Sequence, residues 1–280
     1  MSVNYSDSVE TARTYYNSDD ADNFYFHVWG GEDIHIGLYQ DSDDDIAAAS
    51  RRTVERMAVV AGPLDQETRV LDIGSGFGGA ARYLANRFGC QVTCLNLSEK
   101  ENERNRAMNQ EQDLDHLISV VDGSFESIPA ADERFDLVWS QDAILHSGDR
   151  GRVVGEVARV LRPGGRFVFT DPMQADDCPS GVLQPVLDRI HLSTLASFAF
   201  YRRAAAQHHL EEVEVIPLTE YLPLHYERVR QELEHSRDSL TGKVSESYIE
   251  RMSAGLGHWV EAGRNGYLSW GIMHFRKPAG

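Results

Sequence analysis

The chain has 280 residues, of which 41% are hydrophobic, and a formal net charge of −17. It contains no stretch of roughly 18 uninterrupted apolar residues, which excludes a membrane span, and its acidity disfavours a nucleic-acid partner. Residues 1–10 have neither the basic patch nor the apolar stretch of a secretory signal, so the sequence predicts a cytoplasmic protein.

The basic residues are nearly all of one kind. Lys100, Lys243 and Lys277 are the only lysines among 27 basic residues, and the other 24 are arginines. An acidic surface needs counter-ions to relieve its self-repulsion, as in proteins that work at high salt. We hypothesise a halophilic source, with an ordinary acidic cytoplasmic protein as the alternative. Three cysteines without metal spacing are expected to be structural thiols.

The first 68 residues predict an aromatic lid. An aromatic cluster occupies residues 15–39, and an amphipathic helix is expected over residues 45–62. The acidic run at Asp43–Asp45 indicates a solvated turn and helix start, since it lacks the ligand spacing and central glycine of a calcium loop.

Residues 69–172 alternate short apolar runs with amphipathic stretches, which is typical of a mainly parallel sheet covered by helices. The expected strands cover residues 69–74, 91–97, 118–123, 135–142 and 166–172, and the expected helices cover residues 80–89, 98–112 and 150–161. The LRPGG segment should end the last helix, with Gly164 and Gly165 at positive φ.

Residues 173–210 interrupt the expected alternation, and we interpret them as a substrate cap. Closing strands are expected over residues 211–219 and 268–278, with a helical stretch over residues 226–261 between them. His208 and His209 are assigned to a helix end. Since no linker divides the chain, we expect one α/β domain.

The glycine-rich run VLDIGSGFGG at residues 70–79 follows the first expected strand. In an open parallel sheet, ligands bind beyond the carboxyl ends of the strands, where backbone without side chains can approach them closely. Gly74, Gly76 and Gly79 also satisfy the dinucleotide fingerprint G-x-G-x-x-G. The carboxylate of Asp72 would attract a methionine ammonium and repel a pyrophosphate, which favours a methionine-containing ligand.

Three further motifs follow in order, DGSFESIP, FDLVWSQDAILH and VARVLRPGGRF. With the glycine turn, they make residues 60–172 resemble the class I S-adenosylmethionine-dependent methyltransferases. The resemblance implies a Rossmann-like sheet, mostly parallel with one antiparallel strand near the edge. The segments YFHVWGGEDIHIGLY, WSQDAILHSGD, TDPM and GLGHWVEAGRNGYLSWGIMHFRKP look like the sarcosine/dimethylglycine N-methyltransferases of glycine betaine biosynthesis. Betaine serves osmoprotection, which agrees with the halophile hypothesis.

The resemblance implies S-adenosyl-L-methionine as cofactor and S-adenosyl-L-homocysteine as product. The implied cofactor-binding residues are Gly74, Ser75 and Gly76 at the methionine part, Gln141 near the methionine ammonium, Asn96 and Leu97 at the ribose and adenine, and Ser124 and Phe125 at the adenine edge. The carboxylate of Asp72, at the same turn, is expected to interact with that ammonium. Asn96 departs from the acid usual at the ribose. Asp142 and His146 are implied to face the methyl-transfer pocket.

The acceptor is expected to be a small amine, sarcosine or dimethylglycine, and no metal is expected. Aromatic faces attract a quaternary ammonium product, and imidazole titrates near working pH. The candidate substrate residues are Tyr16, Tyr25, Trp29, Tyr39 and Tyr201 for the amine, Arg202 for the carboxylate and His146 for the proton. Alternatives are another small-molecule methyltransferase, acting on phosphoethanolamine, a tocopherol-like phenol or a lipid, or a non-catalytic cofactor-binding module. Monomer and dimer both remain open.

Overall fold

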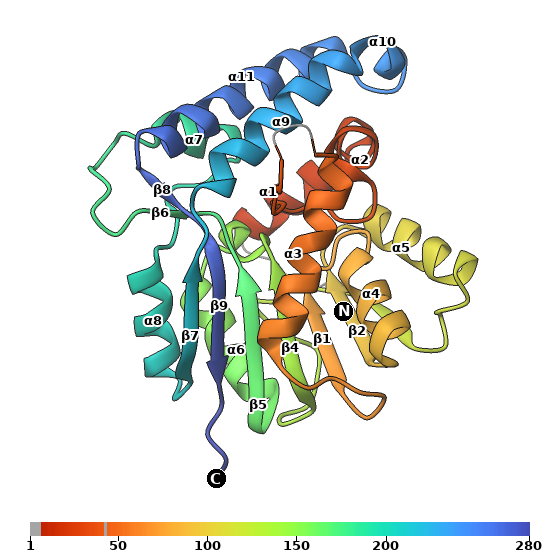
Figure 1. Cartoon of the computed structure of the whole chain (residues 1–280), viewed down its shortest axis with the longest axis vertical. Helices are drawn as coiled ribbons and strands as arrows, with labels where there is room; N and C mark the ends of the chain where they lie inside the picture. Colours follow the sequence, from red (N-terminus) through yellow and green to blue (C-terminus); the bar gives the residue numbers. More distant parts are fainter. Residues whose placement is uncertain (1–6, 42–43) are drawn as a thin grey trace.

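A computed structural model of the chain describes residues 7–41 and 44–280. Its centre is a seven-stranded sheet in the order β3-β2-β1-β4-β5-β9-β7 (Figure 1). The strands are β1 (Arg69–Ile73), β2 (Gln91–Asn96), β3 (Ile118–Asp122), β4 (Phe135–Gln141), β5 (Leu161–Thr170), β7 (Glu211–Pro217) and β9 (Gly271–Arg276). Only β9 runs antiparallel to its neighbours β5 and β7, which confirms the expected sheet.

Alternation along the strands builds two apolar layers, because successive side chains point to opposite faces of a sheet. Val70, Cys94 and Val168 pack on one face under α3 (Ile46–Ala61) and α4 (Gly79–Phe88). The opposite face packs against α6 (Arg150–Val160) and α8 (Phe198–Gln207). The helix α5 (Glu99–Glu111) contacts β2 and β3.

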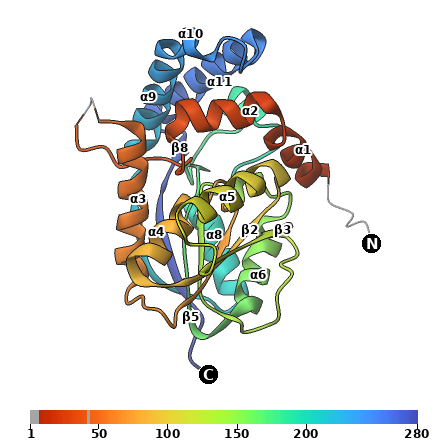
Figure 2. The ribbon, with the colours of Figure 1, turned by 90° about the vertical axis from the view of Figure 1, so that its right-hand side faces the viewer.

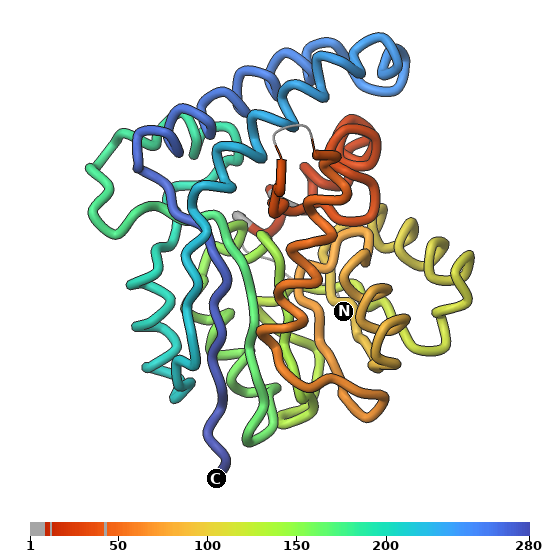
Figure 3. The backbone as a smooth tube through the Cα atoms, viewed as in Figure 1, coloured from red at the N-terminus to blue at the C-terminus, as the bar shows by residue number. Residues whose placement is uncertain are grey.

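A helical cap lies over one end of the sheet (Figures 1 and 2). It consists of α1 (Asp7–Tyr16), α2 (Asp19–Phe24), the π-helix η1 (Tyr25–Gly30), α7 (Gln184–Arg189), α9 (Tyr221–His235), α10 (Arg237–Leu240) and α11 (Glu246–Arg264). A small sheet of β6 (Met173–Gln174) and β8 (Leu268–Ser269) joins this cap to the core. Figure 3 traces the long hairpin of α9 and α11 across the cap, and it shows the C-terminus at the opposite end of the molecule.

The cap is not formed by the expected segment, residues 173–210, alone. Within that segment α7 joins the cap, whereas α8 covers the sheet because its buried face, including Tyr201 and Ala205, packs into the core layer. Much of the cap instead comes from α9 to α11, whose buried residues pack with the aromatic N-terminal segment. His208 ends α8 as expected.

The LRPGG turn also differs in one detail. The helix α6 ends at Val160, and Gly164 adopts a positive φ of 79°. Gly165 does not have a positive φ, contrary to expectation. A Cβ at Gly165 would lie 2.8 Å from the Arg162 carbonyl oxygen, so close packing of the backbone explains this glycine.

Local signals set other boundaries. Asp45 caps α3 by accepting a hydrogen bond from the Ala48 N–H at 3.1 Å, while Asp43 of the same acidic run lies outside the described residues.

Cys90 and Cys94 are buried and unbridged, and burial raises their thiol pKa values to about 11 and about 12. In the described part of the chain, no helix is both long and apolar enough for a membrane span.

Candidate active site

The glycine turn lies between β1 and α4, at the point where the strand order reverses. Gly74 has φ +73°, and a Cβ there would overlap the Cβ of Ala143. Gly76 has φ +50° and faces Ile34 of the N-terminal segment. Positive φ values favour glycine, so the backbone of this turn accounts for the glycines in its sequence.

The next two glycines serve protein packing instead of ligand approach. A Cβ at Gly78 would meet the Asn105 side chain at 2.6 Å, and one at Gly79 would meet the Glu32 carbonyl oxygen at the same distance. The dinucleotide pattern in the sequence therefore combines glycines of two different kinds.

A cavity opens beside Gly74 and Gly76. It is lined by Arg13, Tyr16, Tyr25, Ile34, Gly74, Gly76, Asn96, Leu97, Ser98, Glu101, Phe125, Gln141, Asp142, Ala143 and His146. We call it the cofactor cavity, because six of the residues predicted to bind the cofactor line it: Gly74, Gly76, Asn96, Leu97, Phe125 and Gln141. The Gln141 Oε1 accepts a hydrogen bond from Trp139 Nε1 at 2.9 Å, whereas its buried Nε2 has no partner in the described residues. An amide donor without a partner beside the glycine turn fits the methionine carboxylate of S-adenosyl-L-methionine, and not the ammonium predicted for Gln141, because an ammonium is itself a donor.

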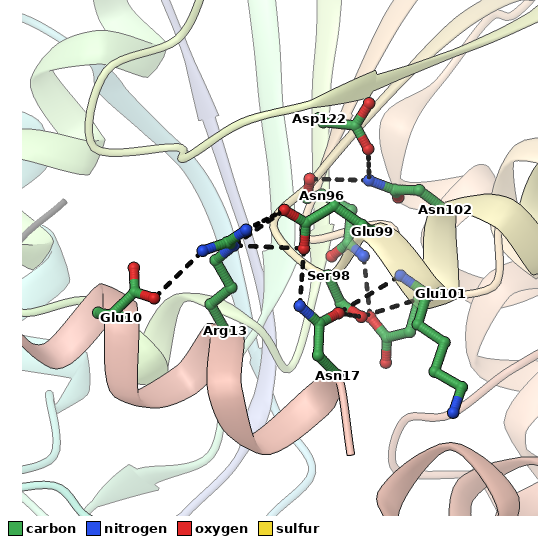
Figure 4. Close-up of polar contacts among 10 residues, drawn as sticks. Glu10, Arg13, Asn17, Asn96, Ser98, Glu99, Glu101, Asn102 and Asp122 are labelled. Carbon is green, nitrogen blue, oxygen red and sulfur yellow. Dashed lines mark hydrogen bonds and ion pairs between the residues drawn. The ribbon is translucent and has the colours of Figure 1, made fainter. Parts of the chain in front are cut away.

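Asn96 lines this cavity together with Glu101, to which it is hydrogen-bonded. Its Nδ2 donates a hydrogen bond to Glu101 Oε2 at 2.8 Å, and Glu101 is 4% exposed (Figure 4). Burial raises the pKa of Glu101 to about 7 despite this bond. A carboxyl group therefore lies near the end of β2 although the sequence has an amide there.

A second cavity lies between the core and the cap. It is lined by Thr11, Tyr15, Tyr16, Tyr25, Trp29, Ile34, His35, Ile36, Asp142, Leu145, His146, Pro172, Arg189, Ile190, His191, Tyr226 and Trp259. Tyr16, Tyr25 and His146 line both cavities. We call this one the acceptor cavity, because it adjoins the cofactor cavity at these shared residues and contains the residues predicted to hold the methyl acceptor.

The acceptor cavity has aromatic walls. Tyr25 and Trp29 lie with ring centroids 5.2 Å apart, and Tyr226 stacks on Trp259 at 4.8 Å. The predicted Tyr16, Tyr25 and Trp29 are therefore brought together, whereas Tyr39 lies outside the lining. The Tyr39 hydroxyl is instead 2.9 Å from His225 Nδ1.

Arg189 supplies a cation that the sequence did not single out. It ends α7 and lines the acceptor cavity. Its Nη2 donates to Met252 Sδ at 3.7 Å, whereas among the side chains that the structure describes its buried Nε has no hydrogen-bond partner and no carboxylate forms an ion pair with the guanidinium. Its aliphatic stem packs against Gly255 of α11, where a Cβ would lie 2.8 Å from Cγ and 2.9 Å from Nε. A guanidinium without an acid in an aromatic cavity is suited to an anionic ligand group.

His146 lies at the junction of the two cavities. Its Nε2 is 2.8 Å from the Tyr16 hydroxyl, and burial lowers its pKa to about 4. Its imidazole is therefore neutral at neutral pH. Neighbouring Asp142 has φ +51° and accepts hydrogen bonds from the Ile36 N–H at 2.7 Å and Trp270 Nε1 at 2.8 Å. These bonds fix the N-terminal segment to the sheet end.

Tyr201 and Arg202 lie outside the lining of both cavities, contrary to their predicted substrate contact. Tyr201 lies on the buried face of α8 and donates a hydrogen bond to Asp171 Oδ2 at 2.6 Å. Arg202 faces outward, because the next residue on a helix is turned by about 100°, and it pairs with Glu212 at 2.8 Å. Asp171 Oδ1 accepts from the Leu145 N–H at 2.9 Å, so Tyr201 supports the turn that carries His146.

Three predicted cofactor residues also lie outside the lining. Asp72 points to the same sheet face as Val70 because strand side chains alternate, and burial together with Asp33 raises its pKa to about 7. Ser75 has a buried hydroxyl without a partner in the described residues. The Ser124 hydroxyl accepts a hydrogen bond from the Glu126 N–H at 3.1 Å. Their predicted contacts with the cofactor remain predictions.

Arg13 and Tyr16 of α1 line the cofactor cavity, and Figure 4 shows the polar contacts between this N-terminal segment and the start of α5. Arg13 Nε donates to Glu99 Oε1 at 3.0 Å, and Asn17 Nδ2 donates to Glu99 Oε2 at 2.7 Å. The Ser98 hydroxyl donates to Asn17 Oδ1 at 2.8 Å. These contacts dock the N-terminal segment onto the first turn of α5.

Comparisons with known proteins agree with this geometry. A family model described as a methyltransferase domain matches residues 71–169. The sarcosine/dimethylglycine N-methyltransferase of Halorhodospira halochloris is 59% identical over 278 residues, covering 99% of this chain and 100% of that protein. The enzyme of the same name from Aphanothece halophytica is 52% identical over 270 residues, covering 96% and 98%. The crystal structure of a "putative sarcosine dimethylglycine methyltransferase" from Galdieria sulphuraria has a TM-score of 0.90 and 43% identity, covering 95% of this chain and 100% of that one.

Proposed function

The chain belongs to the sarcosine/dimethylglycine N-methyltransferases, and we propose that it methylates sarcosine and N,N-dimethylglycine to glycine betaine, using S-adenosyl-L-methionine. Related enzymes with these names share its full length, and the cofactor cavity fits the methionine and ribose parts of S-adenosyl-L-methionine. A cytoplasmic location, predicted from the sequence, remains part of this proposal.

The observation that carries the acceptor assignment is Arg189. Sarcosine and dimethylglycine each carry a carboxylate and an amine separated by one carbon. A partly buried guanidinium without an acidic partner would bind the carboxylate, and Tyr25 and Trp29 would face the amine end. Phosphoethanolamine also carries an anion and an amine, but its phosphate is larger and more highly charged than a carboxylate.

Bound S-adenosyl-L-methionine supplies the methyl group from a sulfonium centre. The residues of the chain hold the amine in line and keep water out, since alignment is the main contribution to such a displacement. Arg189 and the aromatic walls would fix the acceptor at both ends. Developing positive charge on the amine would be stabilised by the aromatic faces.

The low pKa of His146 limits its predicted role as a proton acceptor. A base with a pKa of about 4 holds a proton from an ammonium group only transiently. Neutral His146 is better suited to orient the Tyr16 hydroxyl at the junction of the cavities. We propose this orienting role, with any proton passing on to water.

A transfer assay tests the proposal. The protein is incubated with methyl-labelled S-adenosyl-L-methionine at high salt, in parallel with glycine, sarcosine, dimethylglycine and phosphoethanolamine. We expect label in the sarcosine and dimethylglycine products. Label in phosphoethanolamine alone would overturn the acceptor assignment, and cofactor binding without any transfer would support a non-catalytic module.

The role of Arg189 is tested with a pair of acceptors and a matched variant. Arg189→Met keeps a long side chain without charge, and Arg202→Met removes the exposed arginine that pairs with Glu212. We expect Arg189→Met to lower kcat/KM for dimethylglycine roughly 30- to 1,000-fold, as for loss of a buried charge pair worth about 2–4 kcal/mol. Activity with dimethylethanolamine, which lacks the carboxylate, should change little. Equal losses with both acceptors, or an equal loss in Arg202→Met, would contradict the assignment.

A further inference from the structure

Glu101 has a position that its sequence context does not predict. Ser98 and Glu101 form an S-x-x-E pattern at the start of α5, which is typical of a capping box. In such a box the glutamate side chain accepts a hydrogen bond from the backbone N–H of the capping serine. Here the Ser98 hydroxyl does accept from the Glu101 N–H at 3.2 Å, but the Glu101 carboxylate bonds to Asn96 instead. The glutamate is therefore turned toward the cofactor cavity that it lines.

This carboxylate is buried at an energetic cost that the protein alone does not offset. Its one side-chain partner is the neutral amide of Asn96, and no cation pairs with it in the described part of the chain. The charge of Asp22 lies near enough to raise the pKa of Glu101 further, beyond the effect of burial. A buried carboxylate normally needs two or three donors, so at least one donor is missing.

The surroundings indicate which donors complete the site. Asn102 Nδ2 donates to the Asn96 carbonyl oxygen at 3.1 Å and to Asp122 Oδ1 at 2.8 Å, which fixes the end of β2 against β3 and α5 (Figure 4). The cofactor cavity is also lined by Leu97 and Phe125, which offer apolar surface for a base. The ligand group that joins such a base to the part held at the glycine turn would be a ribose, whose two hydroxyls are donors.

We propose that Glu101 binds the ribose diol of the adenosyl group, with Asn96 holding its carboxylate in place. This inference rests on the proposed cofactor of the enzyme. It assigns to a helix residue the contact that a strand-end acid makes in dinucleotide-binding folds. Asn96 then acts as a positioning residue, which accounts for an amide where an acid is expected.

Binding measurements without turnover test the proposal. The affinities of S-adenosyl-L-homocysteine and of its 2′-deoxy and 3′-deoxy analogues are measured by calorimetry for the native protein, Glu101→Ala and Glu101→Gln. The matched control is Glu103→Gln, an exposed glutamate on the same helix. The native protein and the control should bind at least one deoxy analogue about 10- to 100-fold more weakly, as for loss of a hydrogen bond to a charged group.

Glu101→Ala should bind the ribose compound and both analogues with nearly equal affinity, and Glu101→Gln should retain only part of the discrimination. A native protein that does not discriminate, or an alanine variant that weakens all three ligands by the same factor, would overturn the role of Glu101. Absence of any S-adenosyl-L-homocysteine binding by the native protein would instead refute the proposed function.

Discussion

Gly255 offers a test of Arg189 that leaves its charge in place. Replacing glycine by alanine inside a helix normally stabilises a protein by about 1 kcal/mol. In α11 the added methyl group would overlap Arg189 Cδ and lie 2.8 Å from Cγ and 2.9 Å from Nε, so the arginine stem must move by roughly 1 Å to bring Cδ back to ordinary contact. A displacement of this size in an active site can lower the rate about 100-fold, or about 2.7 kcal/mol of transition-state stabilisation.

We therefore expect Gly255→Ala to lower kcat/KM for dimethylglycine about 100-fold in a labelled-methyl assay, while the melting temperature does not fall. The matched control is Gly257→Ala on the same helix, where a Cβ would approach Arg230 Nη1 no closer than 3.8 Å. It should retain activity and gain a little stability. Native kcat/KM in Gly255→Ala, alongside an inactive Arg189→Met, would refute the reasoning that links helix packing to the position of the guanidinium.

Three further predictions concern the cofactor, pH and salt. Gly76→Val should weaken S-adenosyl-L-homocysteine binding in calorimetry, because φ is +50° and the Cβ would lie 3.1 Å from Ile34 Cδ1; unchanged affinity would refute the placement of the cofactor. The pKa of His146 falls from 6.5 unfolded to about 4 folded, so folding excludes its proton and stability should decline as the pH falls from 6.5 to 4, by about 3 kcal/mol from this group. Urea unfolding of the native protein and His146→Gln checks this, and parallel pH curves would contradict it. The melting temperature should rise between 0.1 and about 2 M KCl, because added ions screen a net charge of −17, and a fall would sink the halophile hypothesis.

Local sequence signals predicted the core well. The strand ending at Gly74 and the stop at Gly164 depend on neighbours within a few residues, so their patterns are readable without the fold. Gly78 and Gly79 were misinterpreted because the residues that they contact come from elsewhere in the chain, from α5 and the N-terminal segment. The dinucleotide fingerprint cannot distinguish such packing from ligand approach.

The acceptor site was less predictable because it is assembled by the cap. Arg189 reaches the cavity only because α7 packs on α11 at Gly255, a contact between residues 66 positions apart that no local pattern encodes. Arg202 was equally plausible by composition, but the packing of α8 on the sheet turns it outward. Glu101 was not singled out from the sequence, because the S-x-x-E pattern that it forms with Ser98 is already explained by a capping box at the start of α5.

The position of α1 affects access to both the cofactor cavity and the acceptor cavity. Arg13 of this helix lines the cofactor cavity, Thr11 and Tyr15 line the acceptor cavity, and Tyr16 lines both. The helix is fixed to α5 by the hydrogen bond from Arg13 to Glu99. Undocking of this one helix would therefore change the lining of both cavities at once, so access to the two cavities depends on a single set of contacts between α1 and α5.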